Sequence, residues 1–316
     1  MFLFQPIFKT IFMGTPAFAV PSLRALADAE NVTLVATNPD RPAGRGNVIA
    51  PTPVKAEAQR LGIPVFQPEK ARNPDAVARF AEEKPDLIVV AAYGHILPQS
   101  ILDIPKYGCI NVHASLLPRY RGAAPINWAV ARGETVSGVT IMKMDAGMDT
   151  GPILHVRELP IGDDDTAETI YPRLAELGAQ ALREALQMLH DDKLVAIPQD
   201  DALATTAPML RKEHGKADWS RSARDLRNLV RGLTPWPSVT AEHGGKGLKL
   251  IAVTVAAEEG CAGAPGEILS AGKGGVVVAC GSGSLRLDTV QPEGGKPMDS
   301  AAWALGRQIK PGDRLA

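Results

Sequence analysis

The sequence predicts an α/β fold: a Rossmann-like, mostly parallel sheet with helices on both faces, followed by a small OB-like β-barrel at the C-terminal end. Across the first 190 residues, apolar strand-like runs alternate with helical patterns, which is typical of a parallel sheet covered on both faces. After residue 208, short alternating segments separated by glycine-rich turns replace that pattern and indicate a small barrel. A length of 316 residues also fits two domains.

The expected elements follow from apolar runs and helical periodicity. Strands are expected at residues 7–13, 32–37, 86–92, 109–113 and 139–144, and helices at 22–28, 53–61, 75–83, 124–132 and 166–189. The C-terminal part is expected to hold a helix at 222–232 and strands at 248–255, 266–269, 275–279 and 284–290. A first domain is therefore expected at residues 1–190, and residues 209–316 would form the barrel.

An acidic, proline-containing stretch at residues 191–208 is interpreted as the linker between these domains. Charge divides with them, because residues 207–316 carry a net charge of +4 and the preceding residues a net −5. This asymmetry is a mild indication that the C-terminal part meets a polyanion.

Composition excludes several classes of protein. With 45% hydrophobic and 22% charged residues, the chain is neither disordered nor collagen-like. Three cysteines without a C-x-x-C motif and six scattered histidines predict no disulfide framework and no metal site, and a reducing cytoplasm fits best. No segment approaches the roughly 20 apolar residues that span a membrane, so no membrane association is expected. P-loop and G-x-S-x-G motifs do not occur.

The densest polar cluster, residues 111–118, stands at the end of an expected strand. Ligands of open α/β sheets bind beyond the carboxyl ends of the strands. Strand alternation puts Asn111 and His113 on one side, where both can reach the same substrate atom. Asn111 offers a donor for a developing oxyanion, and His113 a proton donor or acceptor near neutral pH. A polar strand end with a helix cap is the alternative of about equal weight.

A glycine-flanked acidic loop, residues 145–151, follows the next expected strand. Asp149 in this loop can approach a histidine closely and favour its protonated form. An ordinary Asx-type turn remains the alternative, and spacing alone favours it.

Two arginine groups suit contacts with phosphates. Arg41 and Arg45 lie on the long loop 38–47 after the second expected strand, and loops of that length in compact domains are often functional. Four arginines, Arg221, Arg224, Arg227 and Arg231, lie within or directly before the helix at 222–232 and fall within about 120° of its circumference; we call them the arginine stripe. The alternative in both places is a solvated surface.

The residues around these clusters resemble a known family. Residues 110–126, Ile-Asn-Val-His-Ala-Ser-Leu-Leu-Pro-Arg-Tyr-Arg-Gly-Ala-Ala-Pro-Ile, are similar to the signature of the folate-dependent formyltransferases. The loop 145–151 is similar to the second motif of that family. Residues 14–16, 39–46, 51–55 and 232–237 narrow the resemblance to the branch that acts on initiator methionyl-tRNA. It extends over essentially the whole chain from about Phe8, and Ala114 stands where many relatives carry glycine.

The resemblance implies transfer of the formyl group of 10-formyltetrahydrofolate to the α-amino group of initiator methionyl-tRNA in translation initiation. It places the catalytic trio at Asn111, His113 and Asp149. It also implies a cytoplasmic enzyme, expected to be a monomer.

The same resemblance assigns two binding regions. It gives the folate contacts to Ser115, Leu116, Leu117 and Pro118. It gives the tRNA contacts to the loop with Arg41 and Arg45 and to the C-terminal barrel, where the arginine stripe lies.

A formyl transfer fits the chemistry of these side chains. The attacking amine must lose a proton and the leaving N10 must gain one, and His113 supported by Asp149 can serve both steps. A covalent intermediate on Cys109 is disfavoured because that residue lies about 13 Å along the strand from His113. A formyltransferase for a sugar or nucleotide amine remains an alternative, as does a catalytically idle tRNA-binding protein, against which the intact trio argues.

Overall fold

The computed structural model describes residues 7–43, 48–260 and 263–316, and it divides into two compact units. The N-terminal unit comprises Met1–Pro125, Val136–Pro160 and Tyr171–Pro208. The C-terminal unit comprises Ile126–Thr135, Ile161–Ile170 and Met209–Ala316, so it includes two short segments that come before residue 208 in the sequence. Among the described residues, no helix has the length and apolar character needed to cross a membrane.

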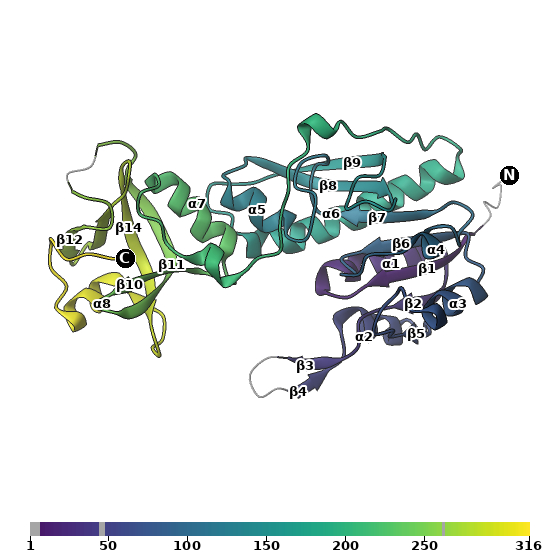
Figure 1. The fold of residues 1–316 in the computed structure, drawn as a ribbon, viewed down its shortest axis with the longest axis horizontal. Helices are drawn as coiled ribbons and strands as arrows, with labels where there is room; N and C mark the ends of the chain where they lie inside the picture. Colours follow the sequence, from purple (N-terminus) through teal and green to yellow (C-terminus); the bar gives the residue numbers. More distant parts are fainter. Residues whose placement is uncertain (1–6, 44–47, 261–262) are drawn as a thin grey trace. The chain divides into compact units, whose positions relative to one another are not determined.

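A seven-stranded sheet with the order β5-β2-β1-β6-β7-β8-β9 forms the centre of the N-terminal unit (Figure 1). The five strands from β5 to β7 pair in parallel, whereas β8 and β9 join antiparallel. Its strands are β1 (Lys9–Gly14), β2 (Asn31–Ala36), β5 (Val65–Phe66), β6 (Leu87–Ala91), β7 (Cys109–His113), β8 (Val136–Lys143) and β9 (Ile153–Pro160). The expected mostly parallel α/β sheet is therefore confirmed.

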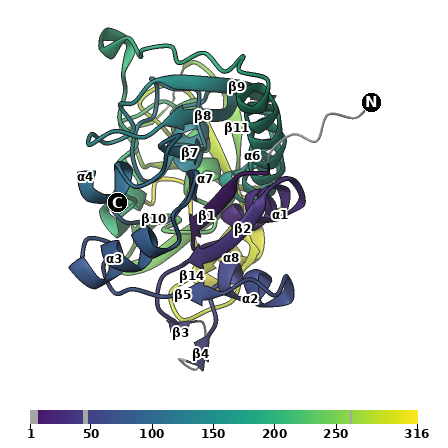
Figure 2. The ribbon, with the colours of Figure 1, turned by 90° about the vertical axis from the view of Figure 1, so that its right-hand side faces the viewer.

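Helices cover both faces of this sheet. In Figure 2, α1, α2 and α6 lie on one side of the strands and α3 and α4 on the other. Phe80 of α3 and Ile101 of α4 pack with Ile11 and Ile88 of the sheet in one buried cluster. The elements are η1 (Ala17–Ala19), α1 (Val20–Ala29), α2 (Pro53–Arg60), α3 (Pro74–Glu82), α4 (Gln99–Leu102) and α6 (Ala167–His190).

Two features of the N-terminal unit were not expected from the sequence. Strand β9 is mostly exposed or half-buried and carries polar residues, so it lacks the apolar run that marks the inner strands. The long loop after β2 contains an antiparallel pair, β3 (Arg41–Ala43) and β4 (Val48–Ala50), rather than irregular chain alone. We call β3 and β4 the hairpin arm.

Residues 191–208, interpreted as a linker, pack against the N-terminal unit from Ile197 onward. Ile197 exchanges two backbone hydrogen bonds of 2.8 Å with Ile153 of β9. Arg121 donates its backbone N–H to Thr205 O (2.8 Å) and accepts from Ala207 N (2.7 Å). We call residues 197–207, which include the short helix η2 (Asp201–Leu203), the strap.

The C-terminal unit is built on an antiparallel sheet with the order β10-β11-β14-β13-β12, to which β15 adds on β14. Helix α7 packs on β11 and β14, and α8 packs on β12, β13 and β14. The elements are α5 (Pro125–Ala131), η3 (Lys212–Gly215), α7 (Ala223–Leu233), β10 (Val239–His243), β11 (Lys246–Ala257), β12 (Ile268–Gly272), β13 (Gly275–Ala279), β14 (Ser284–Pro292), β15 (Met298–Asp299) and α8 (Ser300–Arg307). The expected C-terminal β-domain is confirmed.

The strand pairs leave β10 and β12 as edges, and residues 313–316 lie between them. Glu242 of β10 exchanges two backbone hydrogen bonds with Ala316, of 2.8 and 2.9 Å. Ile268 of β12 donates its N–H to Asp313 O at 2.8 Å. These residues therefore bond to both edge strands and satisfy backbone groups that an open edge would expose.

Candidate active site

Asn111, His113 and Asp149 come together at one end of the parallel sheet. Asn111 and His113 stand on β7, and Asp149 on the loop between β8 and β9. His113 Nδ1 lies 3.6 Å from Asp149 Oδ2, and Asn111 Nδ2 lies 3.5 Å from Asp149 Oδ1. His113 is 5% exposed, while Asn111 is half-buried. Asn111 and His113 are two residues apart on β7, and the loop after β8 brings Asp149 to both of them.

The hydrogen bond of His113 to the backbone determines which nitrogen is the base. His113 Nε2 lies 3.0 Å from Tyr120 O, and a carbonyl oxygen only accepts, so Nε2 carries the proton. Nδ1 of the neutral ring therefore has the free lone pair, on the side of Asp149. When Nδ1 takes up a proton, the new positive charge faces the Asp149 carboxylate. This pair can accept a proton from a bound nucleophile and hold it.

Asp149 is held in place by its neighbours. Gly122 donates its backbone N–H to Asp149 Oδ2 at 2.8 Å. Asp149 itself has a φ of +55°, a left-handed conformation that is uncommon for a residue with a side chain and that clusters at functional sites. Asp145 shapes the start of the loop, because its carboxylate accepts from Gly147 N (3.0 Å) and from the Thr150 hydroxyl (2.8 Å).

Gly151 ends the loop at a position where no side chain fits. A Cβ at this residue would lie 1.9 Å from Lys143 O. The backbone of the loop therefore runs directly against the end of β8, and Asp149 is fixed two residues away from that contact. The glycine flanking seen in the sequence has this physical reason.

A cavity of about 150 Å³ opens beside Asp149. Its walls are His95, Ile96 and Leu97 from the segment after β6, Met142 and Met144 from the end of β8, and residues 145–149. Ile96 and Met148 are 88% and 66% exposed, so apolar surface is open to a ligand at this cavity. The sequence analysis singled out the loop 145–151 but missed the wall at residues 95–97, although Gly94 to Pro98 follow a fully buried strand at its carboxyl end, where ligands of such sheets bind.

His95 forms a fixed, neutral wall of this cavity. Its Nδ1 accepts from Ala71 N at 3.4 Å, and its Nε2 donates to Asn38 Oδ1 at 2.6 Å. Burial, with a smaller contribution from the charge of Arg41, holds the pKa of His95 below its usual range. One face of the ring stacks on Tyr93 with centroids 4.7 Å apart.

Family comparisons agree with this geometry. Residues 8–186 match the family described as Formyl transferase, and residues 209–308 match the one described as Formyl transferase, C-terminal domain. The chain belongs to the formyl transferase family. The resemblance of residues 110–126 to the folate-dependent formyltransferases is thereby confirmed.

Curated relatives cover nearly the whole formyl transferase chain. The methionyl-tRNA formyltransferase of Geobacter sulfurreducens is 53% identical over 308 residues, covering 97% of this chain and 96% of the relative. The methionyl-tRNA formyltransferase of Sorangium cellulosum is 48% identical over 305 residues, covering 96% and 98%.

Solved structures show the same fold. HypX from Aquifex aeolicus in complex with tetrahydrofolic acid has a TM-score of 0.59 at 19% identity, over 95% of this chain and 47% of that one. The N-formyltransferase from Helicobacter canadensis, in complex with folinic acid and dTDP-3-aminofucose, has a TM-score of 0.62 at 18% identity, over 89% and 99%. At these identities the likeness concerns the fold alone.

The four residues expected to bind folate in this formyl transferase shape the turn after β7. Ser115 is fully buried and donates its hydroxyl to Arg119 O at 2.7 Å. Leu117 is buried and donates its N–H to the Thr140 hydroxyl at 3.1 Å, while Leu116 and Pro118 are half-buried. The Ser115 hydroxyl is thus occupied within the protein, and a folate contact of this segment stays a prediction.

The arginines expected to bind tRNA differ in their surroundings. Arg41 is exposed on β3, 3.9 Å from Glu69 Oε2, and Arg45 lies outside the described residues. On α7, Arg224 is exposed and pairs with Glu258 at 2.7 Å.

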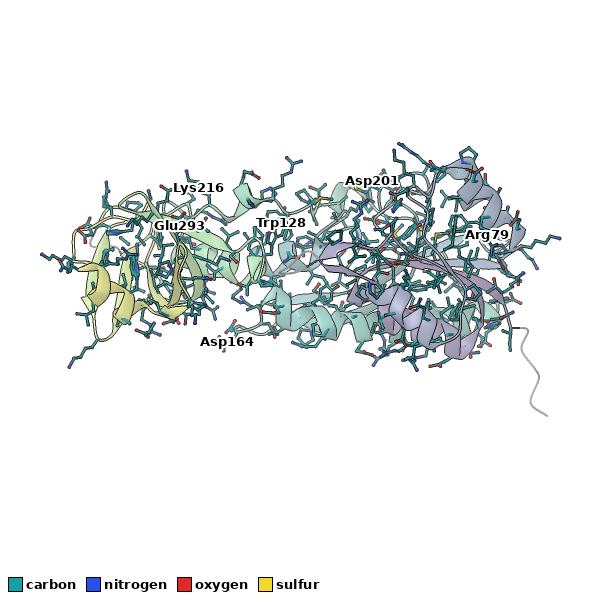
Figure 3. All side chains as sticks on the ribbon, turned by 90° about the horizontal axis from the view of Figure 1, so that it is seen from below. Arg79, Trp128, Asp164, Asp201, Lys216 and Glu293 are labelled. Carbon is teal, nitrogen blue, oxygen red and sulfur yellow. The ribbon has the colours of Figure 1, made fainter. Side chains whose placement is uncertain are left out.

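Arg227 is less free than the sequence indicated. Its side chain is 22% exposed, donates to Asp163 O (2.7 Å) and pairs with Asp164 (3.0 Å), which lies at the surface (Figure 3). The acidic partners of this helix thus come from residues far away in the sequence. The stripe combines structural and solvent-facing arginines.

A covalent intermediate on Cys109 finds no support in this formyl transferase. Cys109 is 1% exposed, and burial raises the pKa of its thiol to about 12, so no thiolate nucleophile forms near neutral pH. Across the described ranges, no group of three or more His, Cys, Asp or Glu side chains could hold a metal ion.

Proposed function

We propose that this chain transfers the formyl group of 10-formyltetrahydrofolate to the α-amino group of initiator methionyl-tRNA. The observation that carries the proposal is the trio of Asn111, His113 and Asp149 beside an open cavity. Relatives that are about half identical over the whole length and are named methionyl-tRNA formyltransferase support the tRNA substrate.

The geometry supports a direct transfer between the two substrates. The neutral amine attacks the formyl carbon, forming a C–N bond, while the formyl oxygen gains negative charge. The Asn111 amide, only weakly engaged with Asp149 at 3.5 Å, turns its N–H toward that oxygen. His113 Nδ1 takes the proton of the attacking amine and returns it, directly or through water, to N10 as the old C–N bond breaks. Asp149 stabilises the charged imidazole between these steps.

We assign the folate co-substrate to the cavity beside Asp149. Methionine, leucine and isoleucine side chains make one wall, and the backbone of residues 145–149 supplies polar groups at another. A planar pteridine ring, apolar on its faces and polar at its edges, needs this combination. Its N10 formyl group would then point toward the trio, since Asp149 belongs to both sites.

The tRNA is assigned to groups on both units. The exposed Arg41 of the hairpin arm and the net positive residues 209–316, with Arg224 exposed on α7, offer phosphate contacts that salt weakens. Residues 1–190 then carry catalysis and the C-terminal barrel carries binding. The enzyme acts as a monomer in the cytoplasm, where translation is initiated.

One assay with three acceptors tests the proposal. Purified protein and 10-formyltetrahydrofolate are incubated with methionyl initiator tRNA, with the same tRNA uncharged, and with an amino sugar nucleotide. We expect N-formylmethionyl-tRNA from the first acceptor alone. Formylation of the sugar nucleotide would favour the related small-amine enzymes, and tRNA binding without any transfer would leave only a binding protein.

A further inference from the structure

The side chain of Gln199 joins the strap to the catalytic loop. Its Nε2 donates to Asp149 O at 2.9 Å and to Gly151 O at 2.7 Å. Both protons of the amide therefore go to carbonyls on either side of Thr150. Gln199 thus holds the backbone of the residue whose carboxylate faces His113.

Arg121 fixes the orientation of that amide. Its guanidinium donates to Gln199 Oε1 through Nε at 3.0 Å and through Nη2 at 2.8 Å. Because a guanidinium only donates, the atom it meets is the amide oxygen, and the NH₂ group must face the two carbonyls. Nη2 also pairs with Asp201, which is 84% exposed (Figure 3). The Arg121 side chain itself is only 11% exposed, so the fork is held rigidly.

The same short stretch of chain also supports the other contacts of the trio. Gly122, next to Arg121, donates to the Asp149 carboxylate, and Tyr120, just before it, accepts from His113. The strap binds this stretch through Thr205, whose hydroxyl accepts from Tyr120 N at 2.9 Å. Backbone and carboxylate of Asp149 are therefore fixed by one assembly of residues 120–122 and the strap.

We propose that Gln199 is a positioning residue for Asp149: its two donated hydrogen bonds keep the carboxylate of Asp149 within reach of His113 Nδ1. It touches neither substrate nor reacting atoms and acts through Asp149 alone. The kinetic part of this inference rests on the proposed formyl transfer, whereas the structural part does not. Misplacing a catalytic group by about 1 Å costs on the order of 10²-fold in rate.

Gln199→Glu removes the hydrogen bonds that Gln199 donates to Asp149 O and Gly151 O while keeping its contact with Arg121. A glutamate has the same shape and keeps the Arg121 contact, but its carboxylate presents only acceptors to the two carbonyls. We expect kcat to fall about 10- to 100-fold in Gln199→Glu and by a similar or smaller factor in Gln199→Ala. KM for both substrates should stay within about twofold. Gln187→Ala, which removes an exposed glutamine whose side-chain amide donates to Asp191, is the matched control and should keep wild-type kcat.

A double-mutant cycle tests the route through Asp149. Single-turnover rates are compared for wild type, Gln199→Ala, Asp149→Asn and the double variant, with enzyme in excess. Since Gln199 acts only by placing the carboxylate, its loss should change the rate less than twofold once that carboxylate is absent. Multiplicative losses, or wild-type turnover in Gln199→Glu, would overturn the assignment.

Amide exchange gives a readout that needs no activity. The Gly122 N–H, which donates to Asp149 Oδ2, should exchange about tenfold faster in Gln199→Glu and at the wild-type rate in Gln187→Ala. Unchanged protection at Gly122 would overturn the positioning role. Absence of formyl transfer by the wild type would refute the proposed function instead, while the exchange measurement still decides the role of Gln199.

Discussion

Asp149→Asn removes one negative charge from the site while keeping the size of the side chain. The carboxylate lies 3.6 Å from His113 Nδ1, and the two side chains are 17% and 6% exposed. Two unit charges at this distance attract by about 4–5 kcal/mol at an effective dielectric constant of about 20. The neutral amide forfeits this attraction at the moment when His113 carries the proton of the amine. An upper limit of about 10³-fold in kcat follows, since about 1.4 kcal/mol is a factor of ten.

The replacement amide also meets two donors. Gly122 N–H and the Asn111 amide point at the two carboxylate oxygens, and an NH₂ group in place of either oxygen faces a donor. We therefore expect a fall of 10²- to 10³-fold in kcat, with folate affinity changed by less than about threefold. Saturating rates with methionyl-tRNA and calorimetric folate titration measure the two effects, with the exposed Asp103→Asn as control. A kcat within about threefold of wild type would refute the assignment of Asp149.

Three further predictions concern catalysis, stability and tRNA binding. His113→Asn should lower kcat by about 10²-fold or more, and near-normal turnover of the folded variant would contradict its role as the base. The hydrogen bond from Arg24 lowers the pKa of Glu57 from 4.5 to about 2, so this pair stabilises the fold above about pH 4.5. That stability is lost as pH falls toward about 2, and Glu57→Gln should flatten the acid limb of a denaturation curve. Arg224→Ala with Arg227→Ala should raise the KM for tRNA and make its salt dependence shallower, and unchanged KM curves at two salt levels would leave these arginines a structural role only.

The sequence indicated the parts of this protein that are encoded locally. Inner strands such as β7 are continuous apolar runs, and Asn111 and His113 fall on one side of it by alternation. Asp149 was found because its glycine-flanked loop follows another strand. Strand β9 was not predicted, because an edge strand with a polar, exposed side lacks a continuous run of apolar residues. Each of these outcomes follows from how much of an element is buried.

Local sequence patterns could not predict contacts between segments that are far apart in the chain. The cavity walls at His95 and Met142 come from the segment after β6 and from β8, which are far apart in the sequence. The partners of Arg227 at residues 163 and 164 lie more than 60 positions away, so the helix appeared to face solvent. Nothing in the sequence indicated a role for Gln199, because a polar residue in an acidic, proline-containing stretch is typical of a linker.

The strap determines where this protein can be cut and fused to a domain of another protein. A chimaera that joined residues 1–190 to a foreign binding domain would inherit Asn111, His113 and Asp149 but lose Gln199 and the backbone partners of Arg121 at Thr205 and Ala207. The transferable catalytic module therefore extends to Pro208, the last residue of the N-terminal unit. A graft made after that residue carries its own alignment device with it, whereas one made at residue 190 depends on the new partner to supply it.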